Sequence, residues 1–379
     1  MEELKKHKLG DLCVFQEGYV NPSQGIAKYF NGNIKWIRAI DLNNGKVFNT
    51  TRTLTDEGFK SAGKSAMLFK PGTIVLSKSG TIGRLGLIQD FMCGNRATIN
   101  IAPKNNTNIL YIFYNLLSRQ DEIANLAVGS VQKNLYVSIL EQMDIMLPSE
   151  SIQKKTVELL SSIDDKIEIN NRINHNLEEQ VKALYKYWFV DFEPFKDEKF
   201  KDTEIGVIPE NWQTGKLSEL IEICYGKDHK KLHDGSIPVY GSGGLMRFVD
   251  KSIYDKESVL IPRKGTLNNV MYVDKPFWTV DTMFYSKSKV DNIIKYCHQY
   301  LLTQDLASMN AGSAVPSMTT DILNNLIVII PPSQIMATFD CIASSMYDEI
   351  SQRNEESLAL TKTRDSLLPQ LMTGRYIGY

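Results

Sequence analysis

An internal repeat constrains the fold of this 379-residue chain more than any other feature of its sequence. Residues 129–148 align with residues 312–331 at a constant offset of 183, and the match continues for about forty residues without a gap. A repeat of this length predicts two copies of one structural unit. The length of the chain agrees with this prediction, because one hydrophobic core rarely serves so many residues.

Each copy continues into a long segment with the periodicity of a helix. Mainly apolar side chains recur there at spacings of three and four, which is typical of a narrow coiled-coil-like stripe. Both stripes become polar at the same place, and such buried polar positions commonly fix the register of a helical seam. The first stripe comprises Ile152, Thr156, Leu159, Ile163, Ile167, Asn170, Asn174, Leu177, Val181 and Leu184, and its repeat comprises Ile335, Phe339, Ile342, Met346, Ile350, Arg353, Ser357, Leu360, Arg364 and Leu367.

A second matching block lies upstream of each helix. Residues 71–83 and 256–268 align at an offset of 185, and both predict a β-branched strand followed by a basic turn that contains glycine. Further strands are predicted over residues 34–40, 98–102, 278–285 and 326–330.

The predicted fold class is α+β, with two mixed α/β domains joined by two long antiparallel coiled-coil-like helices in a pseudo-two-fold internal repeat. A charged, proline-containing and aperiodic segment between the halves is predicted to be a linker. The predicted boundaries are a first domain over 1–148, a first spacer helix over 149–190, the linker over 191–212, a second domain over 213–332, and a second spacer helix with the C-terminal tail over 333–379.

Charge is distributed unevenly along a chain whose net charge is only −1. Residues 1–148 hold 17 basic against 12 acidic side chains, and residues 213–333 hold 13 against 12. The remaining segments are acidic, with 9 basic against 14 acidic residues over 149–212 and 4 against 6 over 334–379. Because nucleic acids are usually met by a basic surface, this segregation keeps a nucleic-acid partner open despite the balanced total.

No catalytic or metal-binding constellation emerges from the sequence. The run from Gly72 to Ser79 lacks the second glycine that a phosphate-binding Walker loop requires. His229 and His233 have the spacing of a helical metal pair, but they are flanked by lysines and no third ligand is evident, so a basic surface loop is favoured. The acidic pairs Asp164–Asp165 and Glu178–Glu179 are expected on the solvated face of a helix. We therefore predict a non-catalytic chain without a metal site.

Cysteine usage and hydropathy indicate the compartment. The five cysteines are scattered and form no CxxC pair, which favours reduced and mostly buried thiols. The first residues lack an apolar signal core, and no stretch approaches the roughly 18 apolar residues of a membrane-spanning helix. A cytoplasmic location without a membrane partner is expected.

Candidate DNA-contacting residues cluster in the two glycine-flanked basic turns. Lys and Arg neutralise phosphates, while Arg, Asn and Ser also pair with base edges in the major groove. An ordinary solvated hairpin loop is the alternative for each turn, and its occurrence at equivalent places in both halves favours a shared function. The candidates are Ser77, Lys78, Ser79, Thr81 and Arg84 in the first half and Arg263, Lys264, Thr266 and Asn268 in the second, with Arg38, Asn95, Arg96, Lys133, Lys230 and Arg247 as weaker candidates on the same reasoning.

The order of several short motifs resembles one known family over nearly the whole chain. KLGDL at the start recurs as GKLSEL in the second half, and GSVQKNL and GSAVPSM precede the two helices. IPVYGSGGLMRFVD, PFWTVDTMFY, ALYKYWFVDFEPF, GVIPENW and LLPQLMTG complete the set. In these motifs and their duplication the sequence is similar to the specificity subunits of type I restriction-modification systems.

The resemblance implies two target-recognition domains that each read one half of a split double-stranded DNA site, with the helices setting the gap. It also implies two methylation subunits that supply S-adenosylmethionine-dependent adenine methylation, and restriction subunits, with ATP and Mg, that cut unmodified DNA. None of these cofactors is expected on this chain. A DNA-binding scaffold without sequence choice and a nuclease fused to its own recognition domain are the competing hypotheses.

Overall fold

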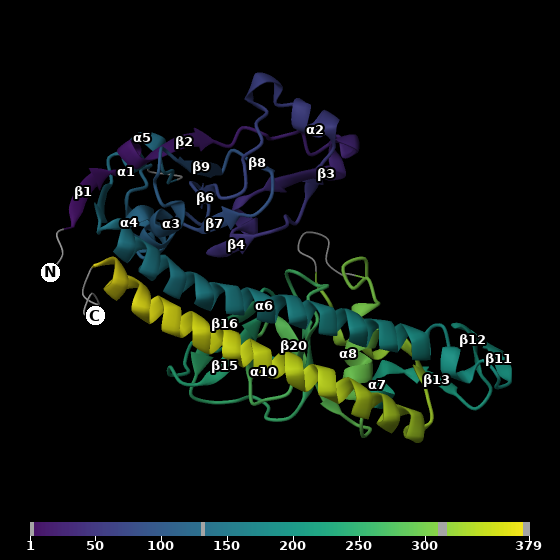
Figure 1. Cartoon of the computed structure of the whole chain (residues 1–379). Coiled ribbons are helices and arrows are strands. Elements are labelled where there is room, and N and C mark those ends of the chain that lie inside the picture. The colour runs from purple at the N-terminus through teal and green to yellow at the C-terminus, as the bar shows by residue number, and fades with distance from the viewer. Residues whose placement is uncertain (1–3, 130–132, 310–316, 374–379) are drawn as a thin grey trace. The chain divides into compact units, whose positions relative to one another are not determined.

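The computed structural model describes residues 4–129, 133–309 and 317–373 of the chain. They form two compact units: unit 1 lies within residues 1–170 and 356–379, and unit 2 comprises residues 171–355. Two long helices, α6 (Glu150–Phe189) and α10 (Ser333–Met372), are drawn as continuous ribbons in Figure 1. Each of them contributes one part to unit 1 and the other to unit 2.

The main sheet of unit 1 has five strands in the order β2-β9-β6-β7-β4. Neighbouring strands are antiparallel except for the parallel pair β4 and β7. All residues of β6 and β7 are buried, as expected for short, mostly apolar runs at the centre of a sheet. The bounds are Cys13–Glu17 for β2, Thr98–Pro103 for β9, Ile74–Ser77 for β6, Leu85–Ile88 for β7 and Gly45–Val47 for β4.

Unit 1 also contains a three-stranded sheet, a separate strand pair and five short helices. The three-stranded sheet has the order β5 (Thr53–Leu54), β3 (Phe30–Ile37), β8 (Met92–Gly94), and the pair joins β1 (Lys5–Lys8) to β10 (Asp144–Leu147). The helices are α1 (Leu9–Leu12), α2 (Asp56–Lys60), α3 (Ile109–Leu117), α4 (Gln120–Asn125) and α5 (Val137–Glu141).

The core of unit 1 joins the main sheet to both long helices. Leu76 and Ile99 of the sheet share one buried cluster with Leu160 of α6 and Leu368 of α10. Burying each such side chain contributes roughly 1.5–3 kcal/mol. The long helices are therefore part of the core of the domain in addition to any role as spacers.

Unit 2 has the same topology, except that its main sheet has four strands and lacks a counterpart of β4 among the described residues. Its main sheet has the order β14-β20-β17-β18, its three-stranded sheet the order β16-β15-β19, and its separate pair joins β13 to β21. The strand bounds are Ile221–Tyr225 for β14, Met283–Ser288 for β20, Ser258–Pro262 for β17, Met271–Val273 for β18, Gly244–Val249 for β16, Ile237–Gly241 for β15, Trp278–Thr279 for β19, Gln213–Lys216 for β13 and Ile327–Ile330 for β21. The helices are α7 (Leu217–Leu220), α8 (Ile294–Leu302) and α9 (Thr320–Asn324).

The register of the strands repeats as well as their order. In unit 1, Leu76 pairs with Ile99, and in unit 2 Ile261 pairs with Phe284, in each case 185 residues further along the chain. The predicted fold class, two mixed α/β domains with two long helices and an internal repeat, is thus confirmed. One predicted strand, 278–285, is in fact two, because the chain turns at Val280, whose carbonyl accepts from the Met283 amide at 2.9 Å.

The two long helices run antiparallel within each unit. In unit 1 the Asn170 amide donates to Glu356 at 2.8 Å and to Ser357 at 3.2 Å, and in unit 2 Asn174 donates to Asn354 at 2.8 Å. Both asparagines are buried, as the polar interruption of the stripe predicts. These paired contacts favour one register of the seam over a slipped alternative.

The predicted stripe is wrong at one position in each helix. Leu159 and Ile342, which are equivalent in the repeat, are 45% and 41% exposed. Their neighbours Leu160 and Ala343 are fully buried instead. The reason is that each helix end also packs on the core of its own unit, which turns the buried face away from a pure two-helix seam.

The segment predicted as a linker, 191–212, contains ordered structure. A hairpin of β11 (Phe200–Thr203) and β12 (Gly206–Pro209) follows α6, and Trp212 behind it is fully buried. The rings of Phe192 and Phe195 lie with their centroids 5.5 and 4.9 Å from that of Trp212. Aromatic burial therefore orders a stretch that composition alone predicts to be a linker.

In the described part of the chain, no helix is long and apolar enough to cross a membrane.

Candidate nucleic-acid interface

Four segments of unit 1 meet at one end of its main sheet, around the basic turn that follows β6. The Lys78 amide donates to the Ala97 carbonyl at 2.8 Å, and the Lys78 carbonyl accepts from the Leu135 amide at 2.9 Å. The Gly18 amide, just beyond β2, donates to the Thr98 carbonyl at 3.0 Å. Backbone hydrogen bonds thus bring together residues that lie far apart in the sequence.

Ser77, one of the predicted DNA-contacting residues, does not lie on an exposed surface. Its side chain is fully buried, and its hydroxyl accepts from the Arg84 amide at 2.9 Å and donates to the Thr81 carbonyl. It therefore closes the turn from within. The turn also requires left-handed backbone at Gly80 and Gly83, with φ of 75° and 90°, which favours glycine there.

Lys78 is held by an ion pair. Its Nζ lies 2.6 Å from a carboxylate oxygen of Glu17, the last residue of β2. Side-chain exposures of 17% and 25% show that both groups are partly shielded from water. The charge at the centre of the turn is therefore neutralised. Ser79 is half-buried, whereas Thr81 and Arg84 are exposed.

Two of the segments that contact this turn carry exposed cations, each close in the sequence to the residue that makes the contact. Arg96 is exposed beside Ala97, and Lys133 is exposed two residues before Leu135. Asn95 shapes its own turn, because its side-chain oxygen accepts from the Ala97 amide at 3.1 Å. The structure therefore brings Lys78, Asn95, Arg96 and Lys133 to one place, and their contact with DNA stays a prediction.

Arg38 lies next to this place but is engaged within the unit. The amide of Asn95 donates to the carbonyl of Ile37 at 3.1 Å, which places the end of β3 beside the β8–β9 turn. The Arg38 guanidinium donates to the Thr51 hydroxyl, and its carbon lies 5.3 Å from the ring centroid of Trp36. These contacts hold the loop between Arg38 and Thr51.

The same backbone arrangement recurs in unit 2 around Arg263. The Arg263 amide donates to the Thr282 carbonyl, and the Arg263 carbonyl accepts from the Met318 amide, both at 2.8 Å. The Gly226 amide donates to the Met283 carbonyl at 3.0 Å. Each contact corresponds to one in unit 1, which makes Arg263 the structural equivalent of Lys78.

The side chains at this place differ from those of unit 1. The guanidinium carbon of Arg263 lies 5.4 Å from the ring centroid of Tyr225, and Nη1 donates to the Asp281 carbonyl at 3.2 Å. Tyr225 ends β14 as Glu17 ends β2, because both pair with equivalent residues of the neighbouring strand, Phe284 and Ile99. A tyrosine ring and a guanidinium thus replace a carboxylate and an ammonium.

The remaining second-half candidates divide into exposed and structural residues. Lys264 and Thr266 are exposed on the turn. Asn268 instead fixes the turn, because its side chain accepts from the Ala307 amide at 2.8 Å and donates to Asp305 at 3.3 Å. These two hydrogen bonds give the Asn268 side chain a structural role that requires no ligand.

Lys230 and Arg247 belong to a neighbouring loop that follows Gly226. Arg247 on β16 donates to the Leu232 carbonyl at 2.9 Å and to Asp234 at 3.1 Å, so it supports the loop. Lys230 is exposed on it. His229 and His233 lie in this loop and not on a helix, as the flanking lysines predict.

Two glycines that sequence analysis missed shape both sites. A Cβ on Gly18 would lie 2.2 Å from the Asn95 carbonyl oxygen, and one on Gly226 would lie 2.1 Å from that of Val280. Nothing larger fits between the two segments. The signal was available, because each glycine follows the first leucine of the KLGDL or KLSEL motif by nine residues.

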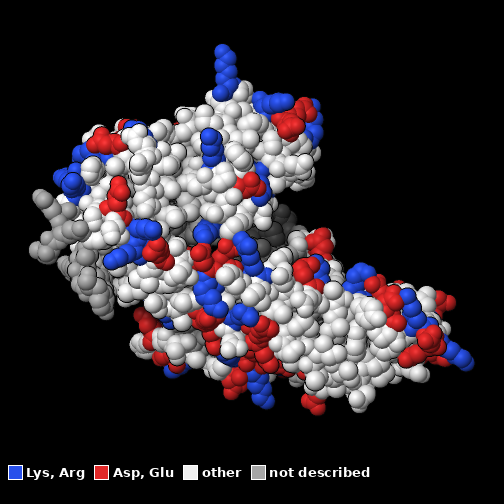
Figure 2. Space-filling model, in the orientation of Figure 1, with Lys and Arg blue, Asp and Glu red and all other residues white. Residues whose placement is uncertain are grey.

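Charge on the surface is mixed. On the face shown in Figure 2, Lys and Arg side chains are interspersed with Asp and Glu side chains and form no continuous basic field. In the described part of the chain, no group of three or more His, Cys, Asp or Glu side chains is arranged to hold a metal ion. All five cysteines are free thiols, and Cys13, Cys93 and Cys297 are buried.

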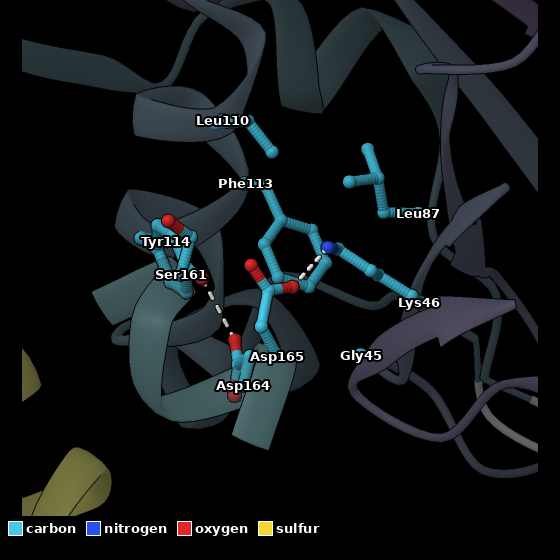
Figure 3. Close-up of a pocket in the computed structure, with 9 residues that line it drawn as sticks. All are labelled: Gly45, Lys46, Leu87, Leu110, Phe113, Tyr114, Ser161, Asp164 and Asp165. Carbon is cyan, nitrogen blue, oxygen red and sulfur yellow. Dashed lines mark hydrogen bonds and ion pairs between the residues drawn. The ribbon is translucent and has the colours of Figure 1, made fainter. Parts of the chain in front are cut away.

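A cavity of about 190 Å³ lies in unit 1, between α3, β4 and α6 (Figure 3). Lys46 of β4 forms an ion pair with Asp165 of α6 across it, and the hydroxyl of Tyr114 donates to Asp164 at 2.7 Å. Leu87 and Phe113 supply apolar walls. Its polar groups are paired with one another, so we assign it no ligand.

Asp164 corrects the prediction of a solvated acidic face. Its side chain is only 10% exposed, and it also accepts from Arg364 of α10 at 2.8 Å. Asp165 is half exposed, and Glu178 and Glu179 are exposed, in line with the prediction. One carboxylate thus connects α3, α6 and α10 within unit 1.

Comparisons with known proteins agree with one another. The sequence model of the family described as "Type I restriction modification DNA specificity domain" matches residues 1–179 and 209–350. The chain is 26% identical to the type I restriction enzyme MjaIX specificity subunit of Methanocaldococcus jannaschii, over 94% of this chain and 90% of that protein. It is 21% identical to the HindI specificity subunit of Haemophilus influenzae, over 99% and 100%. The crystal structure of an S subunit from M. genitalium has the same fold, with a TM-score of 0.53, 18% identity and coverage of 98% of this chain and 96% of that one.

Proposed function

Because the chain belongs to the type I restriction modification DNA specificity family, we propose that unit 1 and unit 2 each read one half of a bipartite DNA sequence. In this proposal the chain itself carries out no catalysis. It acts as the sequence-specific DNA-binding subunit of a type I restriction-modification enzyme, and it selects where the other subunits act.

The observation that supports the proposal most directly is the repeated interface. The same three backbone hydrogen bonds surround Lys78 in unit 1 and Arg263 in unit 2, while the side chains at these equivalent positions differ. A shared frame with different side chains is what two half-sites of different sequence require. Base edges are distinguished by side-chain donors and acceptors in the major groove, whereas phosphate contacts only position the protein.

The long helices provide the spacing between the half-sites in this proposal. Each has 40 residues, which corresponds to about 60 Å at 1.5 Å per residue. The hydrogen bonds of Asn170 with Ser357 and of Asn174 with Asn354 oppose slippage of one helix along the other. A helix pair with a fixed register holds a fixed gap.

The partners follow from the same proposal. Two methylation subunits supply adenine methylation with S-adenosylmethionine, and restriction subunits use ATP and Mg to cut unmodified DNA. A chain that only selects the site needs none of these cofactors itself.

Methylome sequencing tests the function. The chain is expressed with an adenine methylation subunit in cells that lack other adenine methylation, and a control culture receives the methylation subunit alone. We expect one bipartite motif with a constant gap, present only in the first culture. Methylation without a motif would support a scaffold without sequence choice, and magnesium-dependent cutting by the isolated chain would support a fused nuclease.

A second measurement tests the spacer. Inserting four residues after Asn170 and four after Arg353 lengthens both helices by about 6 Å. Four residues are close to one helical turn, so the buried stripes stay nearly aligned. Because DNA rises about 3.4 Å per base pair, the gap in the motif is expected to grow by about one or two base pairs with both halves unchanged. An unchanged gap in a well-folded variant would contradict the spacer role.

A further inference from the structure

The equivalent turns of the two units place different chemistry at the same backbone position. In unit 1 the position holds the ion pair of Lys78 with Glu17, 2.6 Å apart. In unit 2 it holds Arg263 against the ring of Tyr225. The first pair cancels its own charge, whereas the second leaves a cation whose charge no carboxylate among the described residues neutralises.

The Arg263 side chain is held in a defined orientation. Its backbone is bonded on both sides, by the Thr282 carbonyl and the Met318 amide, and its guanidinium lies over the face of Tyr225. Nη1 donates to the main-chain carbonyl of Asp281 at 3.2 Å. A guanidinium has five N–H donors. Among the described residues this carbonyl is the one acceptor that it reaches, so most of its donors remain for a ligand.

A purely structural role accounts poorly for this arrangement. The ring that supports the guanidinium is 52% exposed, so the pair does not close a core. The structural arginine of unit 1, Arg364, shows the contrast, because its side chain is 12% exposed and forms ion pairs with both Asp164 and Asp365. A rigid, partly exposed and unneutralised guanidinium is suited to a planar acceptor that arrives from outside.

We propose that Arg263, positioned by Tyr225, is a specificity-determining residue that donates to the major-groove edge of a guanine in the half-site read by unit 2. This inference rests on the proposed function. Guanine presents two acceptors, O6 and N7, at the spacing of two guanidinium N–H groups, and no other base presents that pair. Phosphate is the other acceptor group on DNA, but a contact with phosphate carries no sequence information and would not make one base position preferred.

The conservative variant Arg263→Lys separates base reading from phosphate contact. It keeps the charge but removes the planar fork. We expect that the wild-type complex methylates a motif with guanine at one position of one half-site, and that Arg263→Lys and Arg263→Ala relax that position alone. Discrimination there should fall about 5- to 150-fold, as measured by binding of the assembled methyltransferase to oligonucleotides that carry each of the four bases.

Two matched variants complete the design. Tyr225→Ala removes the supporting ring and should relax the same guanine position, because Arg263 is then no longer held in its orientation. Lys264→Ala removes the neighbouring exposed cation and should weaken binding to all sequences, with a shallower dependence on salt and the same motif. The melting temperature of each variant shows whether it is folded.

The outcomes distinguish the inference from the function on which it rests. A wild-type complex without any motif would contradict the proposed function. A wild-type motif that Arg263→Lys leaves intact, with guanine still preferred at every original position, would overturn the role of Arg263 and leave the function standing. Relaxation in both half-sites at once would also overturn it, because one side chain of unit 2 contacts only its own half.

Discussion

Unit 1 and unit 2 attach to the long helices through equivalent positions that carry different side chains. In unit 1 the helix residue is an acceptor, Asp164, and the domain residue Tyr114 donates to it at 2.7 Å. In unit 2 the helix residue is Tyr347, and the domain residue Gln299 donates to its hydroxyl at 2.8 Å. The repeat aligns Asp164 with Tyr347 and Tyr114 with Gln299. Both members of the pair differ between the units, yet the domain residue still donates to the helix residue, because a buried polar group without a partner is costly.

A second exchange accompanies the first. Unit 2 buries Lys295 between Glu257 and Asp340, each 3.1 Å away. In unit 1 the residue that aligns with Lys295 is Leu110, and the residue that aligns with Asp340 is Val157, so both are apolar. Burial by itself lowers the pKa of Lys295, but the charges of Glu257 and Asp340 outweigh it, and the pKa is raised. The comparison shows that the contact between domain and long helix, which we call the joint, can be ionic or apolar on the same backbone, provided that the two facing side chains are of the same kind.

The largest expected effect comes from breaking the ionic joint of unit 2. Lys295→Leu leaves Asp340 and Glu257 without their shared cation, and the loss should be about 3–5 kcal/mol of stability. The double variant Lys295→Leu with Asp340→Val carries the residues of unit 1 at these two positions and keeps only Glu257, which is 35% exposed, so its stability should recover to within about 1 kcal/mol of the wild type. Denaturant unfolding followed by hydrogen exchange in unit 2 measures both. A double variant as unstable as the single one would show that the joints are not interchangeable.

Low pH should weaken unit 2 more than unit 1. Burial lowers the pKa of His298 from 6.5 to about 4, and its Nδ1 lies 2.6 Å from the Tyr347 hydroxyl. As the pH falls, His298 becomes protonated in the unfolded chain before it does so in the folded chain. The stability that depends on a neutral His298 is therefore fully present above about pH 6.5 and is lost as the pH falls towards 4. The loss should reach about 3 kcal/mol.

The matching residue of unit 1 provides the control for this pH dependence. His298→Phe introduces the residue that unit 1 has at this position, Phe113, and should remove the difference between the two units in hydrogen exchange from pH 7 to 4.5. Carboxylates of both units titrate in the same range, so the wild type and the variant are compared at each pH. If His298→Phe leaves the pH dependence of hydrogen exchange in unit 2 unchanged, His298 is not the source of that dependence.

A smaller effect is expected at the joint of unit 1. Asp164→Asn keeps an acceptor for Tyr114 but removes the charge opposite Arg364, whose side chain is only 12% exposed. Because Arg364 keeps Asp365 at 2.8 Å, the expected loss is about 1–3 kcal/mol. Asp365→Asn, at a carboxylate that is 57% exposed, is the control and should change the melting temperature little.

The smallest effect is expected at the interface itself. Glu17→Gln removes the charge that pairs with Lys78, and such partly exposed ion pairs contribute roughly 1 kcal/mol or less. The variant should melt near the wild type, yet it should bind DNA more tightly and with a steeper dependence on salt, because Lys78 becomes available. Equal salt slopes for the two proteins would place Lys78 outside the DNA contact.

The sequence by itself determined the repeat, the fold class and the course of the two long helices. These features depend on local patterns: apolar residues at spacings of three and four predict a helix, and β-branched runs bounded by glycine predict strands, wherever they occur. The buried asparagines of the seam were predictable for the same reason. Repetition strengthened each pattern, because every signal was present twice.

Only the tertiary structure decided which residues share the interface and which side chains are buried. Ser77 begins a polar run of the sequence, yet its side chain lies inside the turn, and Leu159 fits the helical stripe, yet it is exposed. Glu17 and Tyr225 carry no motif, and they reach Lys78 and Arg263 only because β2 and β14 end beside turns that follow other strands. Contacts of this kind depend on strand order and on packing between distant segments, and no local spacing encodes those.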